Sequence, residues 1–255
     1  MVINSRMDNF NSAITSLDSL TKTFDVFVPS LNKKIKFKGL TTKQQKDAVK
    51  TALDKNVTGI TFSNLLNKII LENSTEKSSF LLIDRSYIIL SLRVQSLSNT
   101  LQTEEGNVDL SFVPNNNIAL PENLKKHEIV EGNIKLNVSI PSLEKDTFVN
   151  NETRKKLAPI PDNDDFAKES IGEVFINELI KYIDVVTINE GPQPIVITLN
   201  ELTFDQKVQL VEKLPLNINS KLVDFINSVK TFERKYVTDN GKEIELDIDP
   251  TLFTV

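Results

Sequence analysis

Residues 80–97 read FLLIDRSYIILSLRVQSL and form the most apolar segment of the chain. Large apolar side chains recur there at intervals of four, three, four and three residues, at Ile83, Tyr87, Leu90, Val94 and Leu97. Because this spacing places them along one side of an α-helix, it predicts a helix with a seam that packs against its neighbours. Asp84, Arg85 and Arg93 interrupt the run, so we interpret the segment as a core or interface helix and not as a membrane span.

Upstream of this helix, residues 24–38 are predicted to form a β-hairpin. Residues 33–38 read KKIKFK, an alternation that puts lysines on one face of a strand and apolar side chains on the other. Pro29, Ser30 and Asn32 supply the turn. We interpret the lysine face as a solvated outer surface whose charges discourage edge pairing, and the alternative is a basic surface that meets an acidic partner.

Two further helices are predicted between the hairpin and the apolar helix. The first spans residues 41–54, with Thr41 or Thr42 as its cap and Gln45 placed to complete a capping box after Thr42. Ser63 is the expected cap of the second. The apolar residues of this second helix are Leu65, Leu66, Ile69 and Ile70.

Residues 100–165 have a different character. Strand alternation is present at residues 107–113 and 134–140, and the asparagine- and proline-rich sequence between them is typical of loops. Pro159, Pro161 and the aspartates around them predict a linker, so we place a domain boundary at the end of this region.

A regular pattern returns in the C-terminal part of the chain. It predicts helices at residues 170–184, 203–214 and 220–232, a strand or turn region at 185–199 and a closing hairpin at 234–248. Thr203 and Gln206 form a capping-box pattern, and Pro215 is expected to stop the helix that they open. Asn240 and Gly241 are typical of the tight turn of a hairpin.

Together these elements predict an α+β protein with an N-terminal β-hairpin and helices, a loop-rich β middle, and C-terminal helices with a closing β-hairpin. The expected divisions are an N-terminal arm (1–23), a hairpin plus three-helix module (24–100), a loop-rich β insertion and linker (101–165), and a C-terminal helical module with closing hairpin (166–255). The arm has apolar residues at helical spacing, so a helix that docks on a partner and a frayed tail are equally open.

The composition excludes several classes of function. The 255 residues are 39% hydrophobic and 25% charged with a net charge of −5, which is typical of a globular protein and does not call for nucleic acid as a partner. The absence of cysteine excludes disulfides, thiol nucleophiles and thiolate metal sites, and it fits synthesis in a reducing cytoplasm. The one histidine, His127, lies among charged residues in a predicted solvated loop. No secretory signal and no membrane-spanning run is recognised.

An acidic cluster near residue 162 is the nearest approach to a metal site. Counted from Asp162, the calcium-loop positions one, three and twelve are Asp162, Asp164 and Glu173, but positions five and six are Phe166 and Ala167, where an oxygen ligand and a glycine are needed. We interpret the cluster as part of an acidic linker. No catalytic, cofactor-binding or metal-binding residues are therefore predicted, and no small-molecule substrate.

Two segments resemble a known family. Val28, Pro29 and Ser30, followed by KKIKFK and a helix start rich in Lys and Gln, are similar to the opening L-P-S-x-x-K-x-I-K-F-R of the T-even-type myophage baseplate hub family, the baseplate hub assembly proteins. The apolar helix is similar to the F-D-x-x-Y-x-x-L-x-I-R-x-x-S helix of that family at Ile83, Asp84, Tyr87, Leu90, Leu92, Arg93 and Ser96. The C-terminal half fits the family in the order of its elements, and the resemblance leaves out residues 1–23 and 100–165.

The chain departs from this family in one respect. Members often carry Cys-x-x-Cys pairs after the third helix and in the closing hairpin, and residues 101–112 and 236–243 contain no cysteine. A zinc ribbon cannot be built here from thiolates, so the closing hairpin is expected to rely on its Asn-Gly turn and its cross-strand pairs.

The resemblance implies a structural or assembly component of the baseplate hub of a contractile phage tail. It implies a location in the virion after synthesis in the host bacterial cytoplasm, other baseplate or tail proteins as partners, and no enzymatic activity. Two other classes stay open. One is a chaperone of baseplate assembly that leaves no copy in the virion, and the other is a tail-associated peptidoglycan hydrolase, for which the sequence offers no site.

Overall fold

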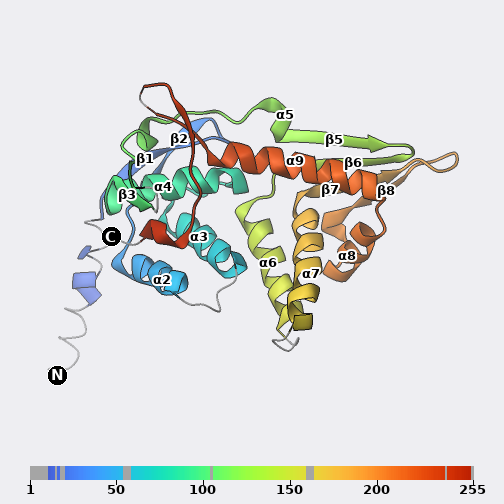
Figure 1. The fold of residues 1–255 in the computed structure, drawn as a ribbon, viewed down its shortest axis with the longest axis horizontal. Helices are drawn as coiled ribbons and strands as arrows, with labels where there is room; N and C mark the ends of the chain where they lie inside the picture. The colour runs from blue at the N-terminus through green and yellow to red at the C-terminus, as the bar shows by residue number, and fades with distance from the viewer. Residues whose placement is uncertain are drawn as a thin grey trace.

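The computed structural model describes residues 11–14, 16–17, 21–53, 59–103, 106–158, 164–238 and 240–253. The molecule is elongated, with the N-terminal hairpin and helices α2–α4 in one half and a four-stranded sheet with helices α6–α8 in the other (Figure 1). Helix α9 (Leu216–Arg234) runs along both halves. Helices and small antiparallel sheets make this an α+β fold, which confirms the predicted class.

The N-terminal hairpin consists of β1 (Thr23–Val28) and β2 (Lys33–Lys38), paired antiparallel along their whole length. Ile35 and Phe37 are fully buried and the lysines that alternate with them are exposed, so the predicted alternation is confirmed. Strand β1 packs against the apolar helix, which leaves the lysine face directed away from the core.

Three helices follow the hairpin, as predicted. They are α2 (Thr42–Leu53), α3 (Gly59–Asn73) and α4 (Arg85–Ser96), the last preceded by the 3₁₀ turn η1 (Leu82–Asp84). In the predicted seam, Ile83, Tyr87 and Leu90 are buried, whereas Val94 and Leu97 are only partly covered. The first three positions therefore form the core of this half of the molecule.

Thr41, one of the two expected caps of α2, is confirmed, whereas the predicted capping box of α2 and the cap at Ser63 are corrected. The capping box of α2 lies one residue earlier than expected, because the Gln44 backbone N–H donates to Thr41 Oγ1 (3.2 Å) and the Thr41 N–H donates to Gln44 Oε1 (3.1 Å). Gln44, and not Gln45, therefore completes it. Ser63 lies inside α3 and not at its start, and its hydroxyl donates to Asp146 Oδ2 at 3.0 Å. Ser63 therefore does not cap a helix but joins α3 to the helix that carries Asp146.

Two of the charged residues that interrupt the apolar helix, Asp84 and Arg93, form hydrogen bonds with segments outside the helix. Asp84 is fully buried and accepts hydrogen bonds from the Ser30 N–H (2.8 Å), the Ser30 hydroxyl (2.6 Å) and the Leu81 N–H (2.8 Å). Arg93 Nε donates to the Leu252 carbonyl at 2.7 Å. These bonds offset part of the cost of burying charge inside an apolar segment.

The middle of the chain has more regular structure than predicted. The elements observed are β3 (Thr100–Thr103), β4 (Gly106–Asp109), η2 (Val113–Asn115), α5 (Glu122–Lys125), β5 (Lys126–Glu131), β6 (Ile134–Ser139) and α6 (Leu143–Leu157). Strand β6 is confirmed, and the strand predicted at 107–113 ends at Asp109. Strand β5 and helix α6 were not predicted. His127 is exposed, but it lies on β5 and not in a loop, and its ring stacks on Phe225 with centroids 5.4 Å apart.

Strands β5, β6, β7 (Ile183–Ile188) and β8 (Ile195–Thr198) form one antiparallel sheet in sequence order. One residue from each strand faces the core in the same row, at Ile129, Leu136, Val186 and Ile197. The predicted strand region at 185–199 is thus confirmed as part of a hairpin. The four strands come from both sides of residue 165, and the predicted division there stays a prediction.

The remaining C-terminal elements follow the predicted order. They are α7 (Asp164–Tyr182), η3 (Leu199–Glu201), α8 (Phe204–Glu212), α9, β9 (Lys235–Val237), β10 (Glu243–Glu245) and η4 (Pro250–Phe253). The capping box of Thr203 and Gln206 is confirmed by reciprocal bonds of 3.3 and 2.9 Å. Helices α7 and α9 begin before residues 170 and 220. Pro215 takes the cap position of α9, where its missing N–H is not needed, so it ends one helix and begins the next.

Parts of the predicted arm and linker lie outside the described residues. In the arm, residues 11–14 and 16–17 have helical backbone, and docking of the arm on a partner stays a hypothesis. Pro159, Pro161 and Asp162 are outside the described residues, and Asp164 is the first residue of α7 and not part of a loop.

We predict that Leu90→Ala lowers the free energy of unfolding by about 2–5 kcal/mol, because Leu90 is fully buried and the change leaves a cavity. Urea denaturation measures this difference. Leu216→Ala is the matched control, since Leu216 is 87% exposed and the same change there is expected to cost less than about 0.5 kcal/mol. Equal losses in the two variants would show that the seam is not core.

A second prediction concerns pH. Burial raises the pKa of the Asp84 carboxyl from 3.8 to about 6, against the bonds from Ser30 and Leu81 that lower it. The folded state therefore binds this proton more tightly than the unfolded chain, so the stabilisation is complete below pH 4 and is lost as the pH rises to about 6. Relative to Asp84→Asn, the wild-type chain should lose about 2 kcal/mol between pH 4 and 7 in urea denaturation. Parallel pH profiles for the two proteins would contradict this.

Candidate functional site

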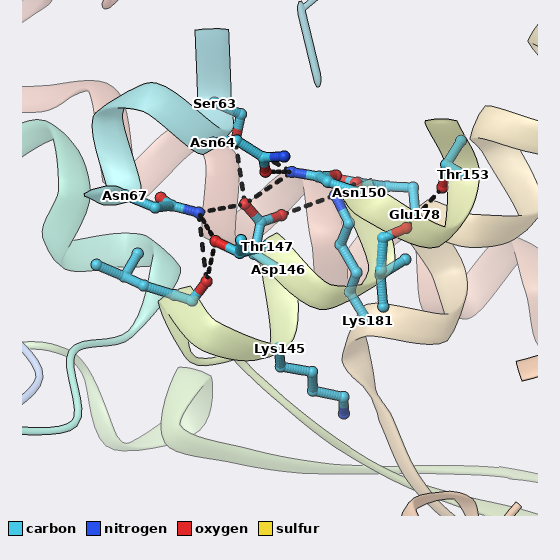
Figure 2. A network of polar contacts seen from close by, with 12 residues as sticks. Ser63, Asn64, Asn67, Lys145, Asp146, Thr147, Asn150, Thr153, Glu178 and Lys181 are labelled. Atoms are coloured by element: carbon cyan, nitrogen blue, oxygen red, sulfur yellow. Dashed lines mark hydrogen bonds and ion pairs between the residues drawn. The ribbon is translucent and has the colours of Figure 1, made fainter. Parts of the chain in front are cut away.

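A buried carboxylate, Asp146 of α6, lies where helices α3, α4, α6 and α7 meet (Figure 2). Its side chain is 1% exposed. Lys181 Nζ lies 2.7 Å from Oδ1, and Oδ2 accepts hydrogen bonds from Asn67 Nδ2 (2.8 Å), the Ser63 hydroxyl (3.0 Å) and Asn150 Nδ2 (3.1 Å). Both carboxylate oxygens are therefore fully engaged by groups of the chain itself.

Charges of alternating sign continue outward from Asp146. Arg85 of α4 lies between Asp146 (3.7 Å) and Glu233 of α9 (3.5 Å). On the other side, Lys181 is 2.8 Å from Glu178, which is 3.2 Å from Lys230 of α9. The three cations and three carboxylates connect four helices into one ion-pair network.

Neighbouring charges decide the ionisation of the network. Burial raises the pKa of the Asp146 carboxyl, but Lys181 and Arg85 outweigh it, so the pKa falls below its ordinary value. The pKa of Glu178 is lowered in the same way, with burial opposed by Lys181 and Lys230. Burial lowers the pKa of Lys181, yet Glu178 and Asp146 raise it overall. For Glu233, burial dominates over the attraction of Arg85 and raises the pKa.

The helix that carries Asp146 buries a polar stripe. Asp146, Asn150 and Thr153 are spaced four and three residues apart and are all nearly inaccessible. Apolar periodicity therefore fails on this helix. Its ends do carry helix signals, because Ser142 caps the first turn by accepting from the Lys145 N–H (3.1 Å) and basic residues occupy the last turn.

A cleft of about 680 Å³ opens beside this network, between α3, α6, α7 and α9. Arg85, Asp146 and Lys181 form part of its lining. Part of the α7 side is apolar and open to solvent, where Ile171, Val174 and Phe175 are 71%, 40% and 47% exposed. Charged groups paired with one another thus lie next to apolar side chains that have no cover.

The cleft does not bring together the residues that the sequence singled out. Glu173 pairs with Lys156 (4.0 Å), His127 lies on β5, and Asp162 is outside the described residues. Among the residues that the structure describes, no group of three or more His, Cys, Asp or Glu side chains is placed to hold a metal ion. Over the same residues, no helix has the length and apolar character needed to cross a membrane.

Comparison with known proteins identifies the family of the chain. The family model described as the T4 bacteriophage base plate protein matches residues 21–249. The chain belongs to this T4 baseplate protein family. No curated protein and no solved structure matches it.

The family match covers more of this baseplate protein than the sequence motifs do. It includes residues 100–165, which the resemblance to the hub family left out, and excludes most of the N-terminal arm. Membership in the family makes the chain a structural component of a phage baseplate, located in the phage tail with other phage structural proteins as its partners.

We predict that Asp146→Asn lowers the free energy of unfolding by about 3–5 kcal/mol, because it leaves the buried cations Lys181 and Arg85 short of one negative charge. The matched control is Glu152→Gln on the same helix. Its partner Lys155 is largely exposed, and the expected cost in unfolding free energy is below about 1 kcal/mol.

The stability of the Asp146 network should also depend on pH. Because the folded-state pKa of Asp146 is lowered, the extra stability of the wild-type chain over Asp146→Asn should be present at neutral pH and should shrink as the pH falls below the ordinary pKa of an aspartate. Urea denaturation at several pH values measures both effects, and equal losses in the two variants would be inconsistent with a structural role for the network.

Proposed function

We propose that this protein is a structural component of the baseplate hub in the contractile tail of a myovirus-type phage, that it remains in the virion, and that it acts by binding other baseplate proteins. The proposal includes synthesis in the host bacterial cytoplasm and assembly from there into the tail.

The hub assignment is supported by the hydrogen bonds that the polar residues of the hub-like motif form in the structure. The polar members of that motif on α4 and η1 are Asp84, Tyr87, Arg93 and Ser96. Besides the contacts of Asp84 and Arg93, the Tyr87 hydroxyl donates to the Lys235 carbonyl (2.8 Å) and Ser96 Oγ accepts from the Leu40 N–H (2.8 Å). Each polar motif residue thus joins α4 to a distant segment, and this supports a shared fold with the hub family.

Two features of the cleft favour binding over chemistry. The oxygens of Asp146 are all engaged by donors within the chain, so this carboxylate is not available as a general base. Exposed apolar side chains on α7 are of the kind that mark contacts between proteins. Recognition through surface complementarity is the function that this arrangement supports best.

Purified phage particles test the proposal. We expect mass spectrometry to find the chain in isolated baseplates, and immunogold labelling in electron micrographs to place it at the centre of the baseplate. Labelling at the rim alone would contradict the hub assignment while leaving the baseplate location intact.

Analysis of purified particles and an assay of the pure protein separate the other two classes of function. A chain that is required for tail formation but absent from purified particles would be an assembly chaperone. Clearing of peptidoglycan by the pure protein, abolished by a single carboxylate substitution, would make it a hydrolase.

A further inference from the structure

Three exposed apolar residues share one face of α7. Ile171, Val174 and Phe175 stand at positions i, i+3 and i+4, so their side chains are neighbours on the helix surface. All three line the cleft beside the ion-pair network, and they are 71%, 40% and 47% exposed. These three residues form what we call the apolar rim of the cleft, and they offer apolar surface to a bound molecule.

Asn177 lines the same cleft two residues further along α7 from this rim. Its side chain is 1% exposed, and within the described part of the chain neither Nδ2 nor Oδ1 has a hydrogen-bond partner. Buried polar groups are normally satisfied, and a side chain whose donor and acceptor are both free needs an explanation. Both amide atoms are closed to solvent, so a ligand that enters the cleft supplies both partners when the Asn177 side chain turns toward it.

The chemistry of Asn177 selects the class of ligand. A carboxamide offers one acceptor and donors side by side, which is the complement of a peptide group. A carboxylate or phosphate would satisfy only the donors, and an ammonium group only the acceptor. The cations that line the cleft, Arg85, Lys181 and Lys230, are already paired with carboxylates of the chain, so the cleft has no free charge with which to recognise an anion.

Helix α7 of a second copy of the chain does not fit this requirement. Packing α7 against α7 of another copy would cover the apolar rim, but the peptide groups inside a helix are already hydrogen-bonded to one another. The bound segment must have free peptide groups, and therefore must be extended or looped at the point of contact.

We propose that the cleft between α3, α6, α7 and α9 binds an extended segment of another baseplate protein, which sets an apolar side chain against Ile171, Val174 and Phe175 and a main-chain peptide group against Asn177. This inference rests on the proposed function and names the kind of partner that the cleft takes.

Photo-cross-linking during infection tests the inference. A tagged copy of the chain with a benzophenone amino acid at position 174 is supplied in trans to a phage that lacks the gene, and the cross-linked peptides are mapped after irradiation. A cross-link to a segment of another tail protein is expected. Cross-links only within this chain, only to a second copy, or to no protein would overturn the inference.

Asn177→Leu supplies a readout that a purely structural role would not give. Because it removes a polar side chain that is buried without partners, the melting temperature should stay equal or rise. The yield of the cross-link from position 174 should nevertheless fall by about tenfold, because two hydrogen bonds to the bound segment are lost. An unchanged yield would overturn the role of Asn177, and a lower melting temperature would show that the amide is satisfied inside the fold.

Two substitutions of exposed apolar residues, one on the rim and one outside the cleft, serve as a test variant and its matched control. Ile171→Ser should also lower the cross-link yield by about tenfold without changing the melting temperature. Leu216→Ser changes a side chain that is 87% exposed on α9 outside the cleft lining, and it should leave the yield as it is. Equal effects of the two would overturn the proposed site. The presence of the chain in purified baseplates is measured in parallel. Failure of the hub proposal is then distinguished from failure of the proposal that the cleft binds a neighbouring chain.

Discussion

The arrangement of the helices depends on one buried carboxylate, that of Asp146. Helix α3 reaches it through Ser63 and Asn67, α4 through Arg85 and α7 through Lys181, and α9 joins through the pairing of Arg85 with Glu233. Buried ion pairs add little net stability, because the loss of hydration offsets their attraction. Their effect is to disfavour other arrangements of the helices, since displacing one helix would leave a charge unpaired in the interior. The network therefore favours a single arrangement of these helices, and with it a single shape of the cleft.

Helix α4 and the turn before it have the same role for the extended parts of the chain. Their polar side chains bind backbone groups of the N-terminal hairpin, the segment after it, the closing hairpin and the C-terminal turn. Most of these partners are main-chain groups, which every residue at those positions provides. The residue types that these contacts require therefore lie mainly on α4 and the turn before it. This explains why residues 80–97 are both the segment that decides the fold and the segment that resembles the hub family.

The sequence predicts the elements whose buried face is apolar and fails where that face is polar. The hairpin at KKIKFK, the helix at Leu90 and the sheet strand at Leu136 all follow the apolar rule. Helix α6 buries Asp146, Asn150 and Thr153, and strand β5 carries a charged residue at half of its positions, so neither stands out by hydrophobic period. The cleft has no local signal in the sequence, because its lining comes from helices that are distant in the sequence and meet only in the folded chain.

The pairing of charges within the chain also shapes what the cleft can recognise. Every cation of the network has a carboxylate within 4 Å in the same molecule, so an incoming partner need not break an ion pair and gains nothing from its own charge. What remains for recognition is apolar area on α7 and the amide of Asn177. Apolar contact with one directional polar group is the usual composition of a preformed binding site, in which the polar group fixes orientation and the apolar area supplies affinity. At the proposed site, the segment of a neighbouring chain would therefore be aligned by the amide of Asn177 and held by the apolar area on α7.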